Sequence, residues 1–296
     1  MVFMSSPCTS PIRKLKPEEF PPCLLEIPQP PKELYVEGAL PDSREYVFLT
    51  VVGSRKFSSY GKEACEKIIK GLHGERIIIT SGLALGIDSI AHKAALDAGL
   101  KTVAIPGSGL DRKVLHPHSN KGLADEIVRC GGALLSELPP LMPAGLHTFP
   151  ERNRIMAGIS KATLVIEAQD KSGTLITARL AVEYNRDLLA VPGSIFSLNS
   201  NGTNRLIKQG ATPVSSADDL REALGLSRKD EIKELDLENL SENEKTILET
   251  LSIEPLTKDE LIKQTKIKAS EINTLLSMME IRGLIRELGG KIQRKI

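Results

Sequence analysis

Residues 76 to 88 read Arg76-Ile-Ile-Ile-Thr-Ser-Gly-Leu-Ala-Leu-Gly-Ile-Asp88. The run begins as a buried strand and passes into a helical pattern through a turn bracketed by Gly82 and Gly86. A helix that begins at such a turn presents its first backbone N–H groups, and the positive end of its dipole, to an anion. This stretch therefore predicts an α/β domain whose strand-to-helix turns hold phosphate groups.

The same alternation extends on both sides of this stretch. Expected strands span 46–52, 76–80, 102–105, 133–136, 163–167 and 188–191. Expected helices span 61–72, 87–98, 121–130, 151–160, 175–184 and 203–209. Runs such as Ile77-Ile78-Ile79 are apolar without alternation, which is typical of parallel strands covered on both faces. We therefore expect residues 45–226 to form an extended Rossmann-like domain with a mostly parallel, doubly wound sheet.

Residues 1–44, ahead of this domain, are rich in proline. The prolines between Ser6 and Pro41 recur too closely for a helix interior, because each one removes a backbone donor and restricts φ. We expect this segment to be an extended N-terminal arm or linker.

The composition changes again after residue 226. Residues 227–240 are highly charged with few apolar anchors, which predicts a linker. Ser241 and Glu244 form a capping box, and helical patterns cover 242–251, 258–264 and 270–282. Two short runs, 284–287 and 291–294, flank a Gly-Gly pair that suits a hairpin turn. Residues 241–296 are therefore predicted to form a small C-terminal winged-helix domain.

Charge and cysteine content narrow the possible functions. The chain carries 39 basic and 38 acidic side chains, a net charge of +1, so any anion site must be local. Its four cysteines show no CxxC pair and no His at metal-binding spacing. The N-terminus has no apolar run long enough for a signal peptide or membrane span. We expect a cytoplasmic protein with no metal site, no cofactor and no membrane association.

Gly-containing turns follow the first two expected strands. After the first strand, Gly53 and Ser54 allow close approach of an anion and Arg55 adds a charged fork suited to phosphate. The alternative is an ordinary tight turn with a solvated arginine. After the second strand, Ser81 and Gly82 open the turn that leads to Gly86. Both turns are predicted to contact phosphate.

Phe149 stands at the entrance to a later expected helix. Arg152, Asn153 and Arg154 follow it, so a ring lies beside cations, a pairing suited to single-stranded nucleic acid. The alternative is a buried phenylalanine with exposed arginines. Pro150 is typical of a helix start.

A fourth turn comprises Lys171, Ser172, Gly173 and Thr174. It offers a lysine, two hydroxyls and a glycine at another helix N-terminus, which is a further anion nest. The GxxxxGK[ST] spacing of a P-loop is missing, so ATP hydrolysis of that type is not indicated.

Asp88 and His92 lie four residues apart on the helix expected at 87–98. We assign Asp88 to the first turn of that helix, since a carboxylate facing phosphate would repel it. We assign His92 to packing and hydrogen bonding, because no partner carboxylate or Cys ligand set accompanies it.

These motifs resemble those of the DNA-processing protein A family, also called Smf, of bacterial natural transformation. The matching segments run in order through residues 52–55, 81–88, 91–92, 106–110, 136–137, 149–158, 167–168, 172–178, 191–193 and 202–204. Family members often have a small helical domain where this chain has its Pro-rich segment. His116 stands where the family often has a tyrosine, and His147 where it often has a basic residue.

The resemblance implies an extended Rossmann fold that binds single-stranded DNA, protects it and helps to load the RecA recombinase during transformation. It implies no catalysis and a homodimer, sometimes with a C-terminal winged helix. By the same likeness, the DNA pocket comprises Gly53, Ser54, Arg55, Ser81, Gly82, Phe149, Arg152, Asn153, Arg154, Lys171, Ser172, Gly173 and Thr174.

An enzymatic alternative is a nucleotide phosphoribohydrolase of the lysine-decarboxylase-like (LOG) family, which is similar from Arg152 through Thr174. That family uses a glutamate in a PGGxGTxxE pattern, and here Thr177 falls at the glutamate position. Without the acid, developing positive charge has no evident stabiliser.

A third alternative is a nucleotide-binding transcription regulator. Its recognition helix at 270–282 carries Glu271 and Glu280, which makes it a poor major-groove helix by charge.

Overall fold

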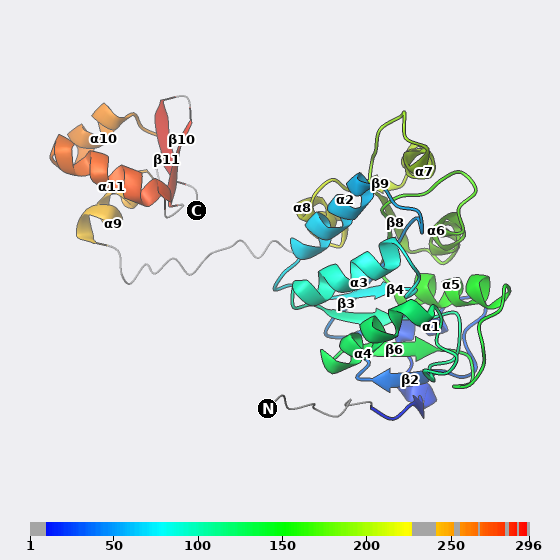
Figure 1. The fold of residues 1–296 in the computed structure, drawn as a ribbon. Helices are drawn as coiled ribbons and strands as arrows, with labels where there is room; N and C mark the ends of the chain where they lie inside the picture. Colours follow the sequence, from blue (N-terminus) through cyan, green and yellow to red (C-terminus); the bar gives the residue numbers. More distant parts are fainter. Residues whose placement is uncertain are drawn as a thin grey trace, which may run out of the picture. The chain divides into compact units, whose positions relative to one another are not determined.

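The structure is a computed structural model that describes residues 10–226, 241–251, 255–265, 267–281, 284–288 and 290–294. The chain divides into two compact units, residues 1–226 and 227–296 (Figure 1). The linker predicted at 227–240 lies outside the described residues. No helix of the described segments is both long and apolar enough to cross a membrane.

The larger unit is built on a nine-stranded sheet with the order β1-β2-β6-β5-β4-β3-β7-β8-β9. The strands are β1 (Arg13–Lys14), β2 (Tyr35–Gly38), β3 (Val47–Val52), β4 (Ile77–Ser81), β5 (Lys101–Ala104), β6 (Ala133–Ser136), β7 (Ala162–Val165), β8 (Asp187–Ala190) and β9 (Thr212–Pro213). Strands β3 to β9 pair in parallel, whereas β2 is antiparallel to both β1 and β6. The predicted mostly parallel sheet is confirmed.

The chain reverses its direction of travel across the sheet beside β3. From β3 it builds outward through β4, β5 and β6, and it then returns to add β7 on the other side of β3. The carboxyl ends of β3 and β7 therefore meet at a topological switch point, where open α/β sheets hold their ligands.

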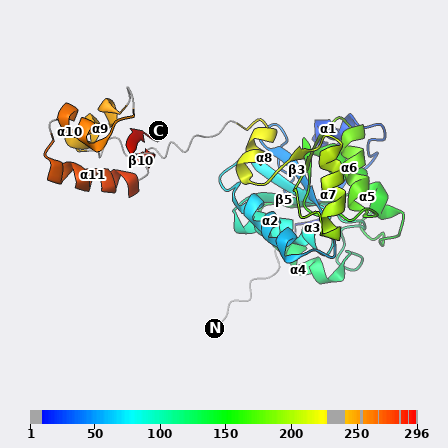
Figure 2. The same ribbon diagram turned by 90° about the horizontal axis from the view of Figure 1, so that it is seen from above.

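Helices cover both faces of the sheet (Figure 2). The helices of one face are α2 (Ser59–Lys70), α3 (Ile87–Asp97), α4 (Lys121–Arg129) and α8 (Ala217–Ala223). Those of the other face are α1 (Pro22–Leu25), α5 (Thr148–Ile159), α6 (Thr174–Glu183) and α7 (Asn201–Lys208). Strand β4 shows why its sequence lacks alternation: Ile77 and Ile79 enter one apolar cluster and Ile78 enters the other.

The elements expected between residues 46 and 209 all form, with ends shifted by a few residues. The largest shift is at α5, which begins at Thr148 and so includes Phe149 in its first turn. Helix α8 and strand β9 were not expected from the sequence. For α8 a signal existed, because Ser216 and Asp219 form a capping box.

The expectation of an extended N-terminal arm or linker was wrong for the described residues 10–44. Strand β2 pairs with β6 over four residues, and Leu24, Ile27, Leu34 and Val36 are buried in the core of the larger unit. The prolines do exclude a long helix. They leave room for short strands and for two short helical turns, and the apolar residues between them supply the burial.

The described part of the smaller unit contains three helices and a hairpin, the arrangement of a winged helix. Its elements are α9 (Glu242–Thr250), α10 (Lys258–Thr265), α11 (Ala269–Ile281), β10 (Ile285–Leu288) and β11 (Lys291–Arg294). The Ser241 capping box starts α9 as predicted, and Gly290 has a φ of 77° in the hairpin turn. Leu256 bridges to Ile292, which adds a third chain segment to the hairpin.

Candidate nucleic-acid interface

A pocket of about 410 Å³ lies at the carboxyl ends of β3 and β7, at the switch point. We call it the switch pocket. Its lining residues are Val52, Gly53, Ser54, Arg55, Lys56, Ala84, Asp88, Phe149, Pro150, Arg152, Asn153, Met156, Gln169, Lys171, Ser172, Gly173, Thr174, Ile176 and Thr177. Of these, Gly53, Ser54, Arg55, Phe149, Arg152, Asn153, Lys171, Ser172, Gly173 and Thr174 were predicted from the sequence.

The turn after β3 is held by the two turns beside it. The Ser54 carbonyl accepts the backbone N–H of Ile87 at 3.2 Å, and the Gly53 carbonyl accepts the Thr174 hydroxyl at 3.1 Å. Gly86, with a φ of 88°, packs so closely on the Ser54 carbonyl that a Cβ there would clash. This packing leaves the Arg55 side chain exposed at the pocket rim.

Arg152 is buried and joins two of the loops that surround the pocket. Its Nη1 donates to the carbonyls of Gly82, at 2.6 Å, and of Ile105, while its Nε donates to Asn153 Oδ1 at 3.1 Å. Burial lowers the pKa of Arg152 to about 10, which leaves it charged at neutral pH. Arg152 therefore adds a fixed positive charge to the pocket and also positions its loops.

Asp88 faces the same pocket, but its carboxylate serves the loop after β4. Oδ2 accepts the backbone N–H groups of Gly82, at 3.1 Å, and of Ala84, at 3.4 Å. Burial raises the pKa of Asp88, while the positive charge of Arg152 opposes that rise. The structural role assigned to Asp88 agrees with these bonds, although its place in the pocket lining was not expected.

Phe149 forms an aromatic corner of the pocket. Its ring packs on Gly107, where a Cβ would lie 2.5 Å from Cδ1, and the His116 ring is 5.7 Å away and tilted by 59°. The Arg55 guanidinium lies 5.6 Å from the ring centre. The ring is half-buried, which is intermediate between an open stacking platform and a core residue.

The turn after β7 brings the N-terminus of α6 to the pocket. Ser172 Oγ accepts the backbone N–H of Thr174 at 3.2 Å, and Gly173 precedes the first helical residue. Lys171 is exposed, and its neighbour Asp170 is engaged in an ion pair with Arg205 at 2.9 Å. A helix N-terminus with a lysine beside it attracts phosphate.

Three predicted residues do not line the pocket. Ser81 is buried and donates its hydroxyl to the Val51 carbonyl at 2.6 Å, and Gly82 lies behind Arg152. Arg154 lies on another side of α5, where it pairs with Glu137 and donates to the Gln29 carbonyl at 2.6 Å. In this structure these residues support the pocket or bind the N-terminal segment.

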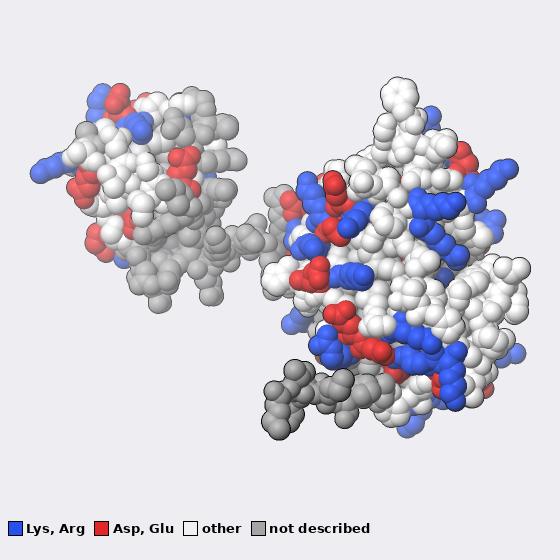
Figure 3. All heavy atoms as spheres, in the orientation of Figure 1, with Lys and Arg blue, Asp and Glu red and all other residues white. Residues whose placement is uncertain are grey.

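Lys56 and Gln169 are further polar lining residues that sequence reasoning missed. Lys56 directly follows the Gly53–Arg55 turn, so its position alone could have indicated it. Within the described segments, Arg55, Lys56 and Lys171 form no ion pair. Figure 3 shows basic side chains toward one edge of the larger unit with few acidic neighbours, whereas basic and acidic side chains are mixed elsewhere on that face.

The carboxylates near the pocket bear on the hydrolase alternative. Thr177, at the position of the hydrolase glutamate, is buried and lines the pocket. Glu167, at the end of β7, is buried and accepts the backbone N–H of Ser58 at 2.9 Å and the Ser58 hydroxyl at 2.5 Å. Those bonds hold the N-cap of α2, so Glu167 is engaged structurally.

The assignment of His92 to packing agrees with its surroundings. Its Nδ1 lies 2.7 Å from Thr102 Oγ1, and the Thr102 hydroxyl donates to the Ile79 carbonyl at 2.5 Å. Burial lowers the pKa of His92 to about 3. Across the described part of the chain, no three His, Cys, Asp or Glu side chains gather as metal ligands.

Comparison with known proteins relates both units to one family. The model of DNA recombination-mediator protein A matches residues 12–225, and that of the DprA winged helix domain matches residues 232–291. Protein Smf of Escherichia coli (strain K12) is 43% identical over 207 residues, which are 70% of this chain and 54% of that protein. The match thus spans about half the length of this relative.

Two solved structures resemble the larger unit. The X-ray structure of DNA processing protein A from Streptococcus pneumoniae has a TM-score of 0.67 at 40% identity, covering 71% of this chain and 74% of that one. The second is a structure of DNA processing protein A from Helicobacter pylori, reported for its unique single-stranded DNA binding mode. Its TM-score is 0.63 at 28% identity. That match covers 73% of this chain and 96% of that one.

Proposed function

The chain belongs to the DNA recombination-mediator protein A family, and on that premise we propose that it acts in DNA processing by binding single-stranded DNA at the switch pocket. The binding is carried by phosphate contacts and base stacking and has little sequence preference. The Helicobacter pylori relative supports this proposal through its described single-stranded DNA binding.

One observation carries the proposal: an unpaired arginine, an unpaired lysine and an aromatic ring converge on one pocket. Arg55 lies beside Phe149, and Lys171 lies at the facing turn before α6. Cations that have no carboxylate partner attract phosphate at low desolvation cost, and a partly exposed ring stacks on a base. A duplex hides its bases in the stack, so this combination favours a single strand.

The wider role follows from the family resemblance. In this proposal the protein protects incoming single-stranded DNA during natural transformation and helps to load RecA onto it, as a cytoplasmic homodimer. Residues 45–226 supply the DNA-binding surface. The N-terminal strands β1 and β2 complete the sheet that supports it. The winged helix at 241–296 is an auxiliary module.

The protein performs no catalysis in this proposal. Thr177 stands at the position of the hydrolase glutamate, and Glu167 is engaged in hydrogen bonds to Ser58, so neither residue supplies the carboxylate that glycosidic cleavage would use. Incubation of the pure protein with nucleoside monophosphates is expected to release no free base. Sustained turnover would favour the hydrolase alternative instead.

The decisive experiment is competition between single-stranded and duplex DNA for the full chain across a salt series. For single strands, log affinity is expected to fall against log salt with a slope of about −0.7 per phosphate neutralised. Arg55→Ala should weaken binding and flatten the slope. Repeating the series with a chain that ends at Leu226 separates the contribution of the winged helix.

Arg129→Ala is the matched control, because Arg129 is an exposed arginine on α4 that pairs with Glu126 within its own helix. It should leave the slope unchanged. Equal affinity for single strands and duplexes, or an unchanged slope in Arg55→Ala, would contradict the proposal.

A further inference from the structure

The loop between β8 and α7 exposes apolar side chains near the switch pocket. Ile195, Phe196 and Leu198 are 79%, 92% and 71% exposed. In Figure 1 this loop extends away from the sheet toward the top of the view. Such exposure is expensive in water, so these side chains indicate a surface that is covered in function.

Two further aromatic residues lie on the segment that faces this loop. Phe57 is 42% exposed and Tyr60, at the start of α2, is 49% exposed. The Tyr60 hydroxyl donates to the Pro192 carbonyl at 2.6 Å, and its ring lies against Gly193. This hydrogen bond holds the ring in place beside a hollow of about 490 Å³, which is lined by Ser58, Tyr60, Pro192, Gly193, Ser194, Ser197 and Ser200.

Asn199 connects this surface directly to the switch pocket. Its Nδ2 donates to the Lys56 carbonyl at 3.1 Å, and its Oδ1 accepts the Gln169 side chain at 2.8 Å. Lys56 and Gln169 both line the switch pocket. A ligand that leaves the pocket past Lys56 therefore meets Phe57 and Tyr60 next.

Four aromatic side chains lie around the switch pocket and the adjoining loop. The sequence has only six Phe, four Tyr and no Trp. Four of these ten, Phe57, Tyr60, Phe149 and Phe196, lie around the pocket and the adjoining loop, all with accessible surface. Serine hydroxyls lie between these aromatic side chains, and Lys56 lies beside them. Such a mixed surface suits a DNA strand, with its bases and phosphates, better than it suits a protein partner, because the centre of a protein interface is depleted of charged residues.

We propose that a single DNA strand seated in the switch pocket continues past Lys56 onto this surface, where Tyr60, Phe57 and Phe196 stack on the bases that follow. This inference rests on the proposed function. We call the surface the stacking shelf. It lengthens the binding site beyond the one pocket and makes affinity depend on oligonucleotide length.

The test is binding of full-length protein to labelled oligothymidylates of increasing length. Wild type should gain affinity with length until the strand covers both the pocket and the shelf. The double variant Tyr60→Ala, Phe196→Ala should match wild type on the shortest oligonucleotides and lose about fivefold or more per missing ring on long ones. Tyr60→Phe keeps the ring and should retain most of the gain. Long strands with abasic sites outside the pocket should bind wild type as weakly as they bind the double variant.

Leu25→Ala is the control, since Leu25 is 50% exposed on α1 and borders neither hollow. A length dependence that is identical in wild type and double variant overturns the shelf but leaves the pocket intact. A variant that keeps full DNA affinity while its mass by light scattering falls would assign the surface to contacts between copies instead. Failure of wild type to bind any single strand would overturn the proposed function itself.

Discussion

The guanidinium of Arg55 lies over the ring of Phe149, with its carbon 5.6 Å from the ring centre. The two residues come from different elements, one from the turn after β3 and one from the first turn of α5. A cation over an aromatic face is stabilised by the ring quadrupole. The contact holds an exposed arginine near the place where phosphate is proposed to bind.

We expect Phe149→Ala to weaken binding of single-stranded DNA by about 1–3 kcal/mol through the lost stacking surface. Because the ring also orders Arg55, the effects of Arg55→Ala and Phe149→Ala should not add. A double-mutant cycle on DNA affinity should give a coupling of at least about 0.5 kcal/mol. Strict additivity would show that the two side chains act independently.

We expect Gly86→Ala to impair both folding and binding. Gly86 combines a φ of 88° with contact against the Ser54 carbonyl, so an added methyl group strains the backbone and displaces the Ser54-Arg55 turn. Gly99 has a φ of 69°, and a methyl group added there would meet nothing within 4 Å. Gly99→Ala should therefore cost only the conformational strain, about 1–2 kcal/mol. Urea unfolding should show a larger loss for Gly86→Ala, and comparable losses would refute the steric argument.

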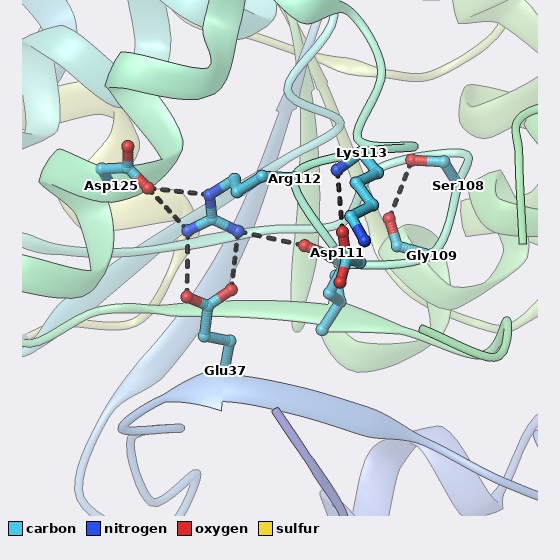
Figure 4. Close-up of polar contacts among 8 residues, drawn as sticks. Glu37, Ser108, Gly109, Asp111, Arg112, Lys113 and Asp125 are labelled. Atoms are coloured by element: carbon cyan, nitrogen blue, oxygen red, sulfur yellow. Dashed lines mark hydrogen bonds and ion pairs between the residues drawn. The ribbon is translucent and has the colours of Figure 1, made fainter. Parts of the chain in front are cut away.

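We expect Arg112→Ala to loosen the N-terminal strands. Arg112 Nη1 and Nη2 grip the buried Glu37 carboxylate of β2 at 2.7 and 2.9 Å, and Nε donates to Asp125 of α4 (Figure 4). Removing Arg112 leaves a buried carboxylate unpaired, which costs about 3 kcal/mol of unfolding free energy. Asp125→Ala removes only the half-exposed partner and should cost about 1 kcal/mol or less. Equal losses in urea unfolding would contradict this ranking.

We expect His92 to make the protein less stable on acidification. Its pKa is about 3 in the folded chain against 6.5 for an ordinary histidine, because burial disfavours the charged ring. The unfolded state therefore binds the proton more tightly, and stability is fully present above about pH 6.5 and falls as the pH drops toward 3. In urea unfolding from pH 7 to 4, His92→Gln should flatten this fall relative to wild type. His147→Gln, at an exposed histidine, should leave the slope unchanged.

The central strands were predictable because runs such as Ile77-Ile78-Ile79 have no plausible place except between two helical layers. The placement of β7 beside β3 was not predictable, because strand order depends on long-range packing that no local pattern encodes. The anion-binding turns were predictable from the order of strand, glycine and helix in the sequence. Their meeting in one pocket was not, because it results from the switch point between β3 and β7.

The different placements of Arg152 and Arg154 have a local explanation. Successive residues of a helix are rotated by about 100°, so Arg152 and Arg154 point about 200° apart around α5. Arg152 lines the pocket, whereas Arg154 pairs with Glu137 on another side of the helix. The N-terminal strands had no such local sign, because proline content excludes a long helix without excluding a short strand.

The two outer strands of the sheet, β1 and β9, contain two residues each, and β9 ends in Pro213. Short edge strands of this kind offer few free backbone groups to a strand from another molecule. A recombinant product that starts at Glu45, where the Rossmann pattern begins, would lack β1 and β2. Strand β6 would then become an unprotected edge strand. Such a product is prone to aggregate during purification, so preparations of the larger unit should retain the Pro-rich segment.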